Sequence, residues 1–259
     1  MNISIIVPCF NEVENVAKLY DELLPVVEDL VMQGGKNATE EIHLAEIIFV
    51  DDGSRDGTYA RLREAFSNNK SGIKYKFTKH DTNLGLGAAL RTGFTHADGE
   101  IVITVDSDGT YKFSEIPALL ACLTPGIDIV TASPYHPKGI VVGVPAYRLL
   151  LSRGSSLIYR FLVDWHIHTY TSLFRAYRSE VIKHIHFKAD DFLAGTELLV
   201  KALLKGYRAA EIPAALHKRV YGVSKAKIAQ TILSHLKFQA WVFCQRLRLI
   251  FGMKTEQIN

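Results

Sequence analysis

The chain has 259 residues, of which 48% are hydrophobic, and it carries a formal net charge of +3 at pH 7. Such a chain can bury one sizeable core, so we expect a single domain with an appendage in preference to two equal domains. No stretch is long and charge-free enough to span a bilayer, and we expect no signal peptide because the N-terminus lacks a basic segment. The three cysteines are far apart, which argues against disulfides and metal-binding motifs and indicates a reducing compartment.

Basic residues dominate the C-terminal part of the chain. Residues 212–255 contain no Asp or Glu, although the whole chain is nearly balanced in charge. The basic residues of this segment are Lys218, Arg219, Lys225, Lys227, Lys237, Arg246, Arg248 and Lys254. A segment of one sign favours an anionic partner, which is a phosphate group, a lipid surface or a nucleic acid.

In the first half of the chain, short apolar segments alternate with helical patterns. Strands are expected at residues 3–7, 46–50, 73–78, 101–105 and 127–132, and helices at 12–30, 59–67, 83–93 and 114–123. Alternation with short connections predicts a right-handed, mainly parallel sheet that is covered by helices on both faces. The predicted fold class is therefore α/β with a Rossmann-like sheet.

Two aspartates one residue apart follow the expected strand at residues 101–105. Asp106-Ser107-Asp108 is followed by Gly109, so hard oxygen ligands stand at the carboxyl end of a buried strand, where α/β proteins place their chemistry. The same residues are also typical of an ordinary strand-to-helix turn. The pair alone leaves both interpretations open.

A second acidic turn follows the strand at residues 46–50. Here Asp51 and Asp52 precede Gly53, and a helix is expected soon after. These carboxylates are candidates for contact with a nucleotide, and the alternative is that they only cap the helix. The glycines of residues 83–93 do not match the dinucleotide fingerprint. The backbone amides of that turn face a phosphate, or else its small residues serve close packing of helix on sheet.

The second half of the chain is more basic. Residues 147–162 combine helical apolar spacing with Arg148, Arg153 and Arg160, which is typical of a basic amphipathic helix. Strands are expected at residues 171–177 and 208–212, a helix at 195–206, and a long amphipathic helix from about 226 to about 251. We divide the chain into a domain at 1–225, with a first half at about 1–132 and a second at about 133–225, and a C-terminal segment at 226–259.

In this order the motifs resemble the family-2 glycosyltransferases of the GT-A fold, in particular the polyprenyl-phosphate sugar transferases typified by dolichol-phosphate mannose synthase. The matching segments are residues 4–12, 49–58, 83–93, 106–108, 147–154, 172–177 and 206–225. Each segment alone is a weak signal, but the collinear set is specific and covers nearly the whole chain. The resemblance implies an inverting transfer of a hexose from a nucleotide-diphosphate sugar to a polyprenyl phosphate, dolichyl or undecaprenyl.

The resemblance also implies which residues bind the donor. The nucleotide sugar would contact the ends of the first two strands and the Asp-x-Asp motif, namely Pro8, Phe10, Glu12, Val50, Asp51, Asp52, Asp106 and Ser107. Asp106 and Asp108 would coordinate Mg²⁺ or Mn²⁺, because hard cations choose oxygen ligands. The metal would neutralise charge on the departing nucleoside diphosphate.

For the acceptor, the resemblance implies a cluster in the second half of the chain. The residues expected to hold the lipid phosphate are Arg148, Ser152, Arg153, Arg219 and Lys225, and Arg148 and Arg219 are expected to be catalytic together with the two aspartates. A phosphate oxygen is ionised at neutral pH, so this nucleophile needs no strong general base. Positioning and charge would dominate catalysis.

The sequence departs from the family pattern in three places. The arginine usually found after the fifth strand is replaced within Ser133-Pro134-Tyr135, unless Lys138 substitutes for it. Thr110 stands where a glutamine is usual after the Asp-x-Asp motif, and Thr169 stands where an aspartate is often seen before Arg175.

Other interpretations remain open. Glu197 is either a catalytic base for a sugar-hydroxyl acceptor or a charge that the macrodipole of its helix favours. A zinc site at His166 and His168 is not expected without a third ligand. The competing functions are a family-2 transferase that acts on a hydroxyl of a glycan or lipid, and a membrane-associated module that binds sugar nucleotides without turnover. A nucleic-acid partner is not expected, since no reader motif accompanies the basic segment.

The terminal helix has three interpretations as well: it packs on the domain, pairs with another subunit, or lies in a membrane interface with Trp241 and Phe243 inserted. We expect a peripheral protein at the cytoplasmic face of a membrane, because a polyprenyl acceptor must be reached from a bilayer. A homo-oligomer or a membrane subunit as partner stays open.

Overall fold

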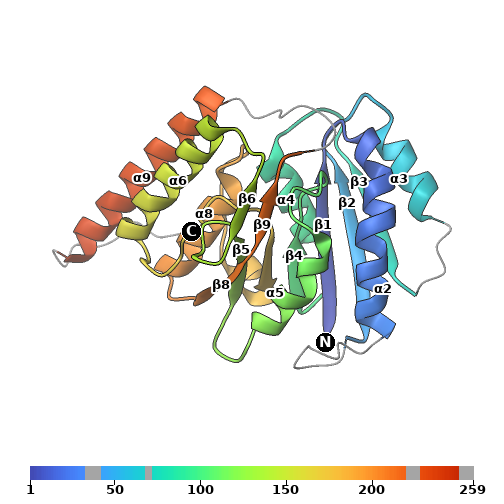
Figure 1. Cartoon of the computed structure of the whole chain (residues 1–259), viewed down its shortest axis with the longest axis horizontal. Coiled ribbons are helices and arrows are strands. Elements are labelled where there is room, and N and C mark those ends of the chain that lie inside the picture. The colour runs from blue at the N-terminus through green and yellow to red at the C-terminus, as the bar shows by residue number, and fades with distance from the viewer. Residues whose placement is uncertain (33–41, 68–71, 220–227, 251–259) are drawn as a thin grey trace.

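A seven-stranded sheet forms the centre of the molecule (Figure 1). The computed structural model describes the chain except for residues 33–41, 68–71, 220–227 and 251–259. The strands are β1 (Asn2–Cys9), β2 (Leu44–Asp51), β3 (Lys74–Lys79), β4 (Ile101–Thr104), β5 (Ile129–Ser133), β7 (Arg175–Arg178) and β8 (Ala209–Pro213). Their order in the sheet is β3-β2-β1-β4-β7-β5-β8.

Most neighbouring strands run parallel, which confirms the predicted mainly parallel sheet. The parallel pairs are β1 with β2, β1 with β4, β2 with β3, and β5 with β8. Strand β7 is antiparallel to both β4 and β5 and lies between them. It is the strand expected at 171–177, but it begins only at Arg175, so the sheet contains strands from both halves of the chain.

A small second sheet was not predicted. Strands β6 (Ile140–Val142) and β9 (Ala215–His217) pair in parallel beside the main sheet. Neither contains a fully buried residue. Because each is three residues long and half exposed, neither produces the apolar run by which a buried strand is recognised.

Helices cover both faces of the main sheet, as expected. One face packs against the segments α1 (Val16–Lys18), η2 (Leu19–Leu23) and α2 (Leu24–Met32), and against α3 (Thr58–Phe66), η3 (Phe113–Glu115) and α5 (Ile116–Cys122). The short 3₁₀ segment η1 (Val13–Asn15) directly precedes α1. The other face packs against α4 (Leu86–Thr95), α7 (Ser179–His184) and α8 (Ala194–Leu204). The single helix expected at 12–30 is divided by a π-helical stretch, η2.

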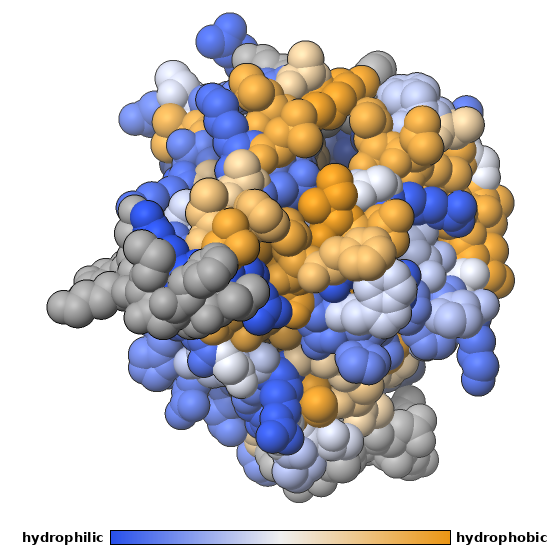
Figure 2. Space-filling view, turned by 90° about the vertical axis from the view of Figure 1, so that its left-hand side faces the viewer, coloured by the Kyte–Doolittle hydropathy of each residue, from blue (hydrophilic) through white to orange (hydrophobic). Residues whose placement is uncertain are grey.

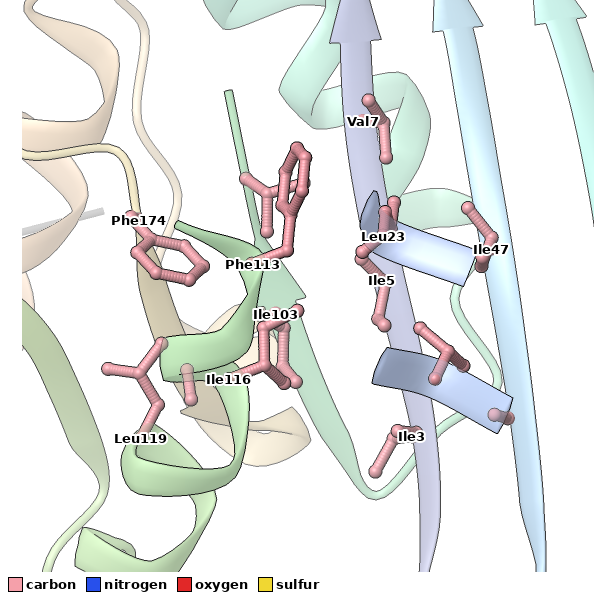
Figure 3. Packing of buried hydrophobic residues seen from close by; sticks show 14 of the residues in the cluster. Ile3, Ile5, Val7, Leu23, Ile47, Ile103, Phe113, Ile116, Leu119 and Phe174 are labelled. Atoms are coloured by element: carbon pink, nitrogen blue, oxygen red, sulfur yellow. The ribbon is translucent and has the colours of Figure 1, made fainter. Parts of the chain in front are cut away.

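The alternation of β1 shows how one strand serves both hydrophobic clusters. Ile3, Ile5 and Val7 point toward α2 and α5 and pack with Leu23 and Ile116 (Figure 3). Ile6 belongs to the cluster on the opposite face of the sheet. This period of two is the geometry of a strand buried on both sides.

Two long helices lie side by side at one end of the molecule (Figure 1). They are α6 (Ala146–Leu162) and α9 (Ile228–Ile250), and both were expected as amphipathic helices. His235 of α9 is 3.2 Å from the hydroxyl of Tyr159 on α6, and Arg246 donates to the carbonyl of Leu162 at 2.7 Å. In the described part of the chain, no helix has the length and hydropathy needed to cross a membrane.

Candidate active site

The carboxyl ends of three parallel strands bring the acidic turns together. The amide of Asp52 donates to the carbonyl of Cys9 at 2.8 Å, and the amide of Val105 donates to that of Ile6 at 3.1 Å. A cleft of about 330 Å³ opens at this edge of the sheet, and we call it the first cleft. It is lined by Pro8, Cys9, Phe10, Glu12, Asp52, Asn83, Leu84, Gly85, Leu86, Ala89, Asp106, Ser107, Asp108, Leu173, Asp190, Asp191, Phe192, Arg219, Gln230 and Thr231.

The first cleft thus contains six of the eight residues predicted to bind the donor: Pro8, Phe10, Glu12, Asp52, Asp106 and Ser107. The other two, Val50 and Asp51, are fully buried and do not line it. Asp51 accepts a hydrogen bond from the amide of Ser54 at 2.7 Å, so its visible role is to hold the turn after β2.

Asp52 organises the loop that borders the first cleft. Its carboxylate accepts hydrogen bonds from the side chain of Asn83 at 2.7 Å and from the amides of Leu84 and Gly85 at 2.9 and 2.8 Å. The ring of His80 lies 2.7 Å from the same carboxylate. Neither Asp51 nor Asp52 caps α3, since Asp56 accepts from the amide at the start of that helix.

The turn at 83–93 serves close packing. Two of its amides already point at Asp52. A Cβ added at Gly85 or Gly87 would collide with the backbone carbonyls of Asp190 and Ala189. The structure therefore favours the packing interpretation over a phosphate bound by these amides.

At the Asp-x-Asp motif, Asp108 is held by neighbours from distant parts of the chain. Its carboxylate accepts hydrogen bonds from the amide of Thr110 at 2.9 Å and from Nε and Nη2 of Arg219 at 2.7 and 2.6 Å. Nη1 of Arg219 also lies 3.3 Å from Glu12. Lys18 donates to the carbonyls of Asp108 and Gly109 at 3.4 and 3.3 Å. Arg219, predicted to meet the acceptor phosphate, is thereby placed at the predicted metal ligands.

The surroundings of Asp106 disfavour the negative charge of its carboxylate. Burial, and after it the nearby carboxylate of Asp108, raise the pKa of Asp106 to about 7, while Arg219 acts in the opposite direction. A divalent cation would reverse this cost, so the donor set fits Mg²⁺ or Mn²⁺. No three His, Cys, Asp or Glu side chains come together as a metal site among the described residues. Such an ion would therefore take further oxygens from the substrate and from water, as Mg²⁺ usually does.

A second cleft of about 480 Å³ lies between α6 and α9. Most of its lining is apolar, including Leu150, Leu151, Ile158, Ile228, Ile232 and Leu236. Figure 2 shows the face formed by these two helices, where hydrophobic residues surround a hollow. The second cleft therefore suits a long apolar ligand.

The predicted acceptor-phosphate residues are only partly brought together. Arg148 and Ser152 line the second cleft, and the hydroxyl of Ser152 is 2.6 Å from that of Thr171. Arg153 does not line it, and its guanidinium lies over the ring of Tyr135, 5.1 Å from the ring centre. Arg219 lies in the first cleft, and Lys225 is outside the described residues.

All three departures from the family pattern occur in the second cleft. Thr110, Pro134, Tyr135 and Thr169 are among its lining residues. The hydroxyls of Ser133 and Thr169 are 2.7 Å apart, so two of the departures are in direct contact. Lys138 is exposed and does not line either cleft, so the structure gives no support for it as a substitute for the missing arginine.

The carboxylate of Glu197 is engaged by neighbouring protein groups. Its carboxylate forms an ion pair with Lys201 at 2.8 Å and accepts hydrogen bonds from the amides of Lys188 and Ala189 at 3.1 and 2.8 Å. It is buried and does not line either cleft. This geometry argues against Glu197 as a catalytic base.

The paired histidines bind carboxylates. His166 is 3.0 Å from Asp164, and His168 is 2.8 Å from Glu211. Each of the two histidines thus contacts a different carboxylate.

Several lining residues were not identified from the sequence. Asp190, Asp191 and Phe192 precede α8, and Gln230 and Thr231 belong to α9. A pair of aspartates just before an expected helix was the one available signal for the first group. No sequence signal pointed to the α9 residues, because an amphipathic pattern does not reveal which part of the molecule the polar side of the helix faces.

Comparison with known proteins places this site in a family. The model of "Glycosyl transferase family 2" matches residues 4–186. Polyprenol monophosphomannose synthase of Mycolicibacterium smegmatis is 31% identical over 94% of this chain and 88% of its own length. Dolichol-phosphate mannosyltransferase of Pyrococcus furiosus is 30% identical over 92% of this chain, which spans only 62% of that longer protein.

Solved structures agree on the fold. Glucosyl-3-phosphoglycerate synthase from Mycobacterium tuberculosis, in complex with Mn²⁺, UDP and glucosyl-3-phosphoglycerate, superposes with a TM-score of 0.61 over 98% of this chain and 81% of that one, at 19% identity. The same enzyme with Mg²⁺ and UDP gives a TM-score of 0.65 over 92% and 79% of the two chains, at 18% identity. The sheet, the site at its carboxyl edge and the family match agree: the chain belongs to the family-2 glycosyltransferases and has the GT-A fold.

Proposed function

We propose that this glycosyltransferase moves a hexose from a nucleotide-diphosphate sugar to a polyprenyl phosphate, with inversion at the sugar and with the help of Mg²⁺ or Mn²⁺. The observation that carries the proposal is that a cleft with paired carboxylates meets an apolar cleft at Asp106, which lines both. A donor diphosphate suits the first cleft and a lipid suits the second. The names of the two relatives support the same acceptor class.

The donor would lie in the first cleft. Phe10, Glu12 and Asp52 border the part nearest β1 and β2, where a nucleoside would bind. Asp106 and Asp108 would hold the divalent ion, which as a Lewis acid neutralises charge on the leaving nucleoside diphosphate. Lys18 would keep the backbone of the Asp108 turn in place through its two carbonyl contacts.

The acceptor would enter from the second cleft. Its isoprenoid chain would lie between α6 and α9, and its phosphate would meet Arg148 and approach Arg219. Arginine suits this role because its planar guanidinium recognises phosphate oxygens through paired donors. The phosphate oxygen is already ionised, which fits a site whose candidate base, Glu197, is committed to Lys201.

The outer face of α6 and α9 would rest on the membrane. Large exposed hydrophobic side chains of these helices lie outside both clefts, among them Leu157, Phe161, Leu233, Phe243 and Leu247. Figure 2 shows that hydrophobic residues cover much of this face. Basic residues of the same helices, Arg148, Arg153, Arg160, Lys237, Arg246 and Arg248, would favour anionic headgroups. We propose a peripheral location at the cytoplasmic face, where nucleotide sugars are available.

Transfer of label tests this function directly. Purified protein is incubated with radiolabelled nucleotide sugars and a polyprenyl phosphate, with and without EDTA, and the organic phase is counted. We expect extractable label that EDTA and Asp106→Asn abolish and that free polyprenol does not replace. Donor binding without transfer to any acceptor would indicate a non-catalytic module, and transfer to a hydroxyl acceptor alone would also overturn the proposal.

A further inference from the structure

Helix α9 contributes to both clefts, although its sequence pattern indicates only that it is amphipathic. Gln230 and Thr231 line the first cleft. The α9 residues that line the second cleft are Ile228, Thr231, Ile232, His235, Leu236 and Gln239. One side of α9 is therefore part of the active site.

The two clefts share a small set of residues. Among the residues that the structure describes, those lining both are Leu86, Asp106, Leu173, Phe192 and Thr231. Three of these side chains are apolar, and Asp106 is the candidate metal ligand. Thr231 is thus the neutral polar side chain at the junction.

The junction is where the transferred sugar must lie. In the proposed reaction, the bond from the anomeric carbon to the donor diphosphate breaks and a bond to an acceptor phosphate oxygen forms. The electron pair of the broken bond leaves with the nucleoside diphosphate. The hexose therefore occupies the point where the donor cleft and the acceptor cleft meet. Its hydroxyls need hydrogen-bond partners there, because a polar group that loses water without one is costly.

The position of Thr231 on this helix is fixed by its neighbours one turn further on. Ser234 donates to Asp191 at 2.6 Å, and Asp191 in turn accepts from the amide of Leu193 at 2.9 Å. His235 lies 3.2 Å from both Ser155 and Tyr159 on α6. Residues three and four apart share one helical face, so these contacts hold Thr231 at the junction.

We propose that Thr231 is a specificity-determining residue, whose hydroxyl forms a hydrogen bond with a hydroxyl of the transferred hexose. The inference rests on the proposed function and goes beyond it, because it assigns sugar recognition to the C-terminal helix. Sites that hydrogen-bond a substrate hydroxyl discriminate against sugars that present it differently. Thr231 would therefore help to select among epimeric donors.

Binding measurements with Thr231→Val test the assignment. Calorimetry compares GDP-mannose, GDP-glucose, UDP-glucose and UDP-galactose, each with its free nucleoside diphosphate, in the presence of Mn²⁺. We expect the valine variant to bind the nucleoside diphosphates as the wild type does. For the preferred donor, the affinity of the sugar nucleotide relative to its free nucleoside diphosphate should fall roughly tenfold. A fall of this size corresponds to the loss of one net hydrogen bond. Thr231→Ser should retain it.

Thr95→Val is the matched control, because Thr95 is exposed on α4 and lines neither cleft. Thermal unfolding of each variant shows whether the fold is intact. If the wild type transfers sugar and discriminates between donors but Thr231→Val does so equally well, the inference is wrong and the proposed function stands. If the wild type binds no sugar nucleotide, both fail.

Discussion

Arg219 donates hydrogen bonds from two nitrogens, Nε and Nη2, to the same carboxylate oxygen of Asp108, at 2.7 and 2.6 Å. The guanidinium thus neutralises a carboxylate that we expect to bind a metal ion. Two cations cannot share one carboxylate oxygen at these distances without repulsion. Arg219 and a divalent ion should therefore compete for Asp108.

Arg219→Gln is expected to strengthen Mn²⁺ binding to the nucleotide-free protein, by up to about tenfold for one removed charge contact. It should also lower sugar transfer, since the same side chain is proposed to meet the acceptor phosphate. Calorimetric titration with Mn²⁺ at pH 8 measures the first effect. Arg61→Gln, which alters an exposed pair with Glu64 on α3, should change neither. Weaker Mn²⁺ binding by Arg219→Gln would contradict the competition.

Asp106→Asn should separate activity from stability. We expect transfer to fall by at least about 100-fold, because the metal loses a charged ligand. The folded pKa of Asp106 is raised from 3.8 to about 7, so its ionisation lowers the free energy of unfolding as the pH rises through that interval. Without metal at pH 8, the asparagine variant should therefore be more stable than the wild type.

Urea unfolding at pH 8 and pH 4 in the presence of EDTA measures this difference. The advantage of the variant should be present at pH 8 and should shrink at pH 4, where the carboxyl is protonated in the folded protein. A variant that is less stable than the wild type at pH 8 would show that Asp106 is stabilised as an anion.

Glu197→Gln tests whether this residue is a base or a structural anchor. The change leaves the ammonium of Lys201 buried without its carboxylate, so we expect a loss of about 3 kcal/mol in the free energy of unfolding. Adding Lys201→Met should recover much of that loss. Transfer per folded molecule should persist at low temperature. Complete loss of transfer in the well-folded double variant would instead support a catalytic Glu197.

The proposed membrane face can be tested without touching either cleft. Phe161 and Leu233 are 73% and 52% exposed, and neither lines a cleft. Phe161→Glu combined with Leu233→Glu should abolish flotation with vesicles of phosphatidylcholine and phosphatidylglycerol. Transfer to a short, water-soluble polyprenyl phosphate should continue. Met32→Glu is the control, since Met32 is 75% exposed on α2. Unchanged flotation of the double variant would contradict this orientation.

Strands β1, β2, β4 and β5 were predictable because each is a largely apolar, buried run. Strand β3 is half exposed and was recognisable only from its alternation of Tyr75 and Phe77 with polar residues. Strand β7 was predictable as a strand but not as an antiparallel one, because a short strand has the same alternation in both directions. The contact of Arg219 with Asp108 joins positions 111 residues apart, so no local pattern indicates it. The same holds for the role of Asp52, whose partners lie 28 to 33 residues further on.

Helix α9 carries Thr231 toward the clefts and Leu233 toward solvent. An α-helix with its side chains is about 10–12 Å across. If its outer side touches the bilayer, that thickness sets the distance between headgroups and sugar. A lipid phosphate would then need to rise from the membrane by little more than one helix diameter, with its isoprenoid tail still anchored among the lipids.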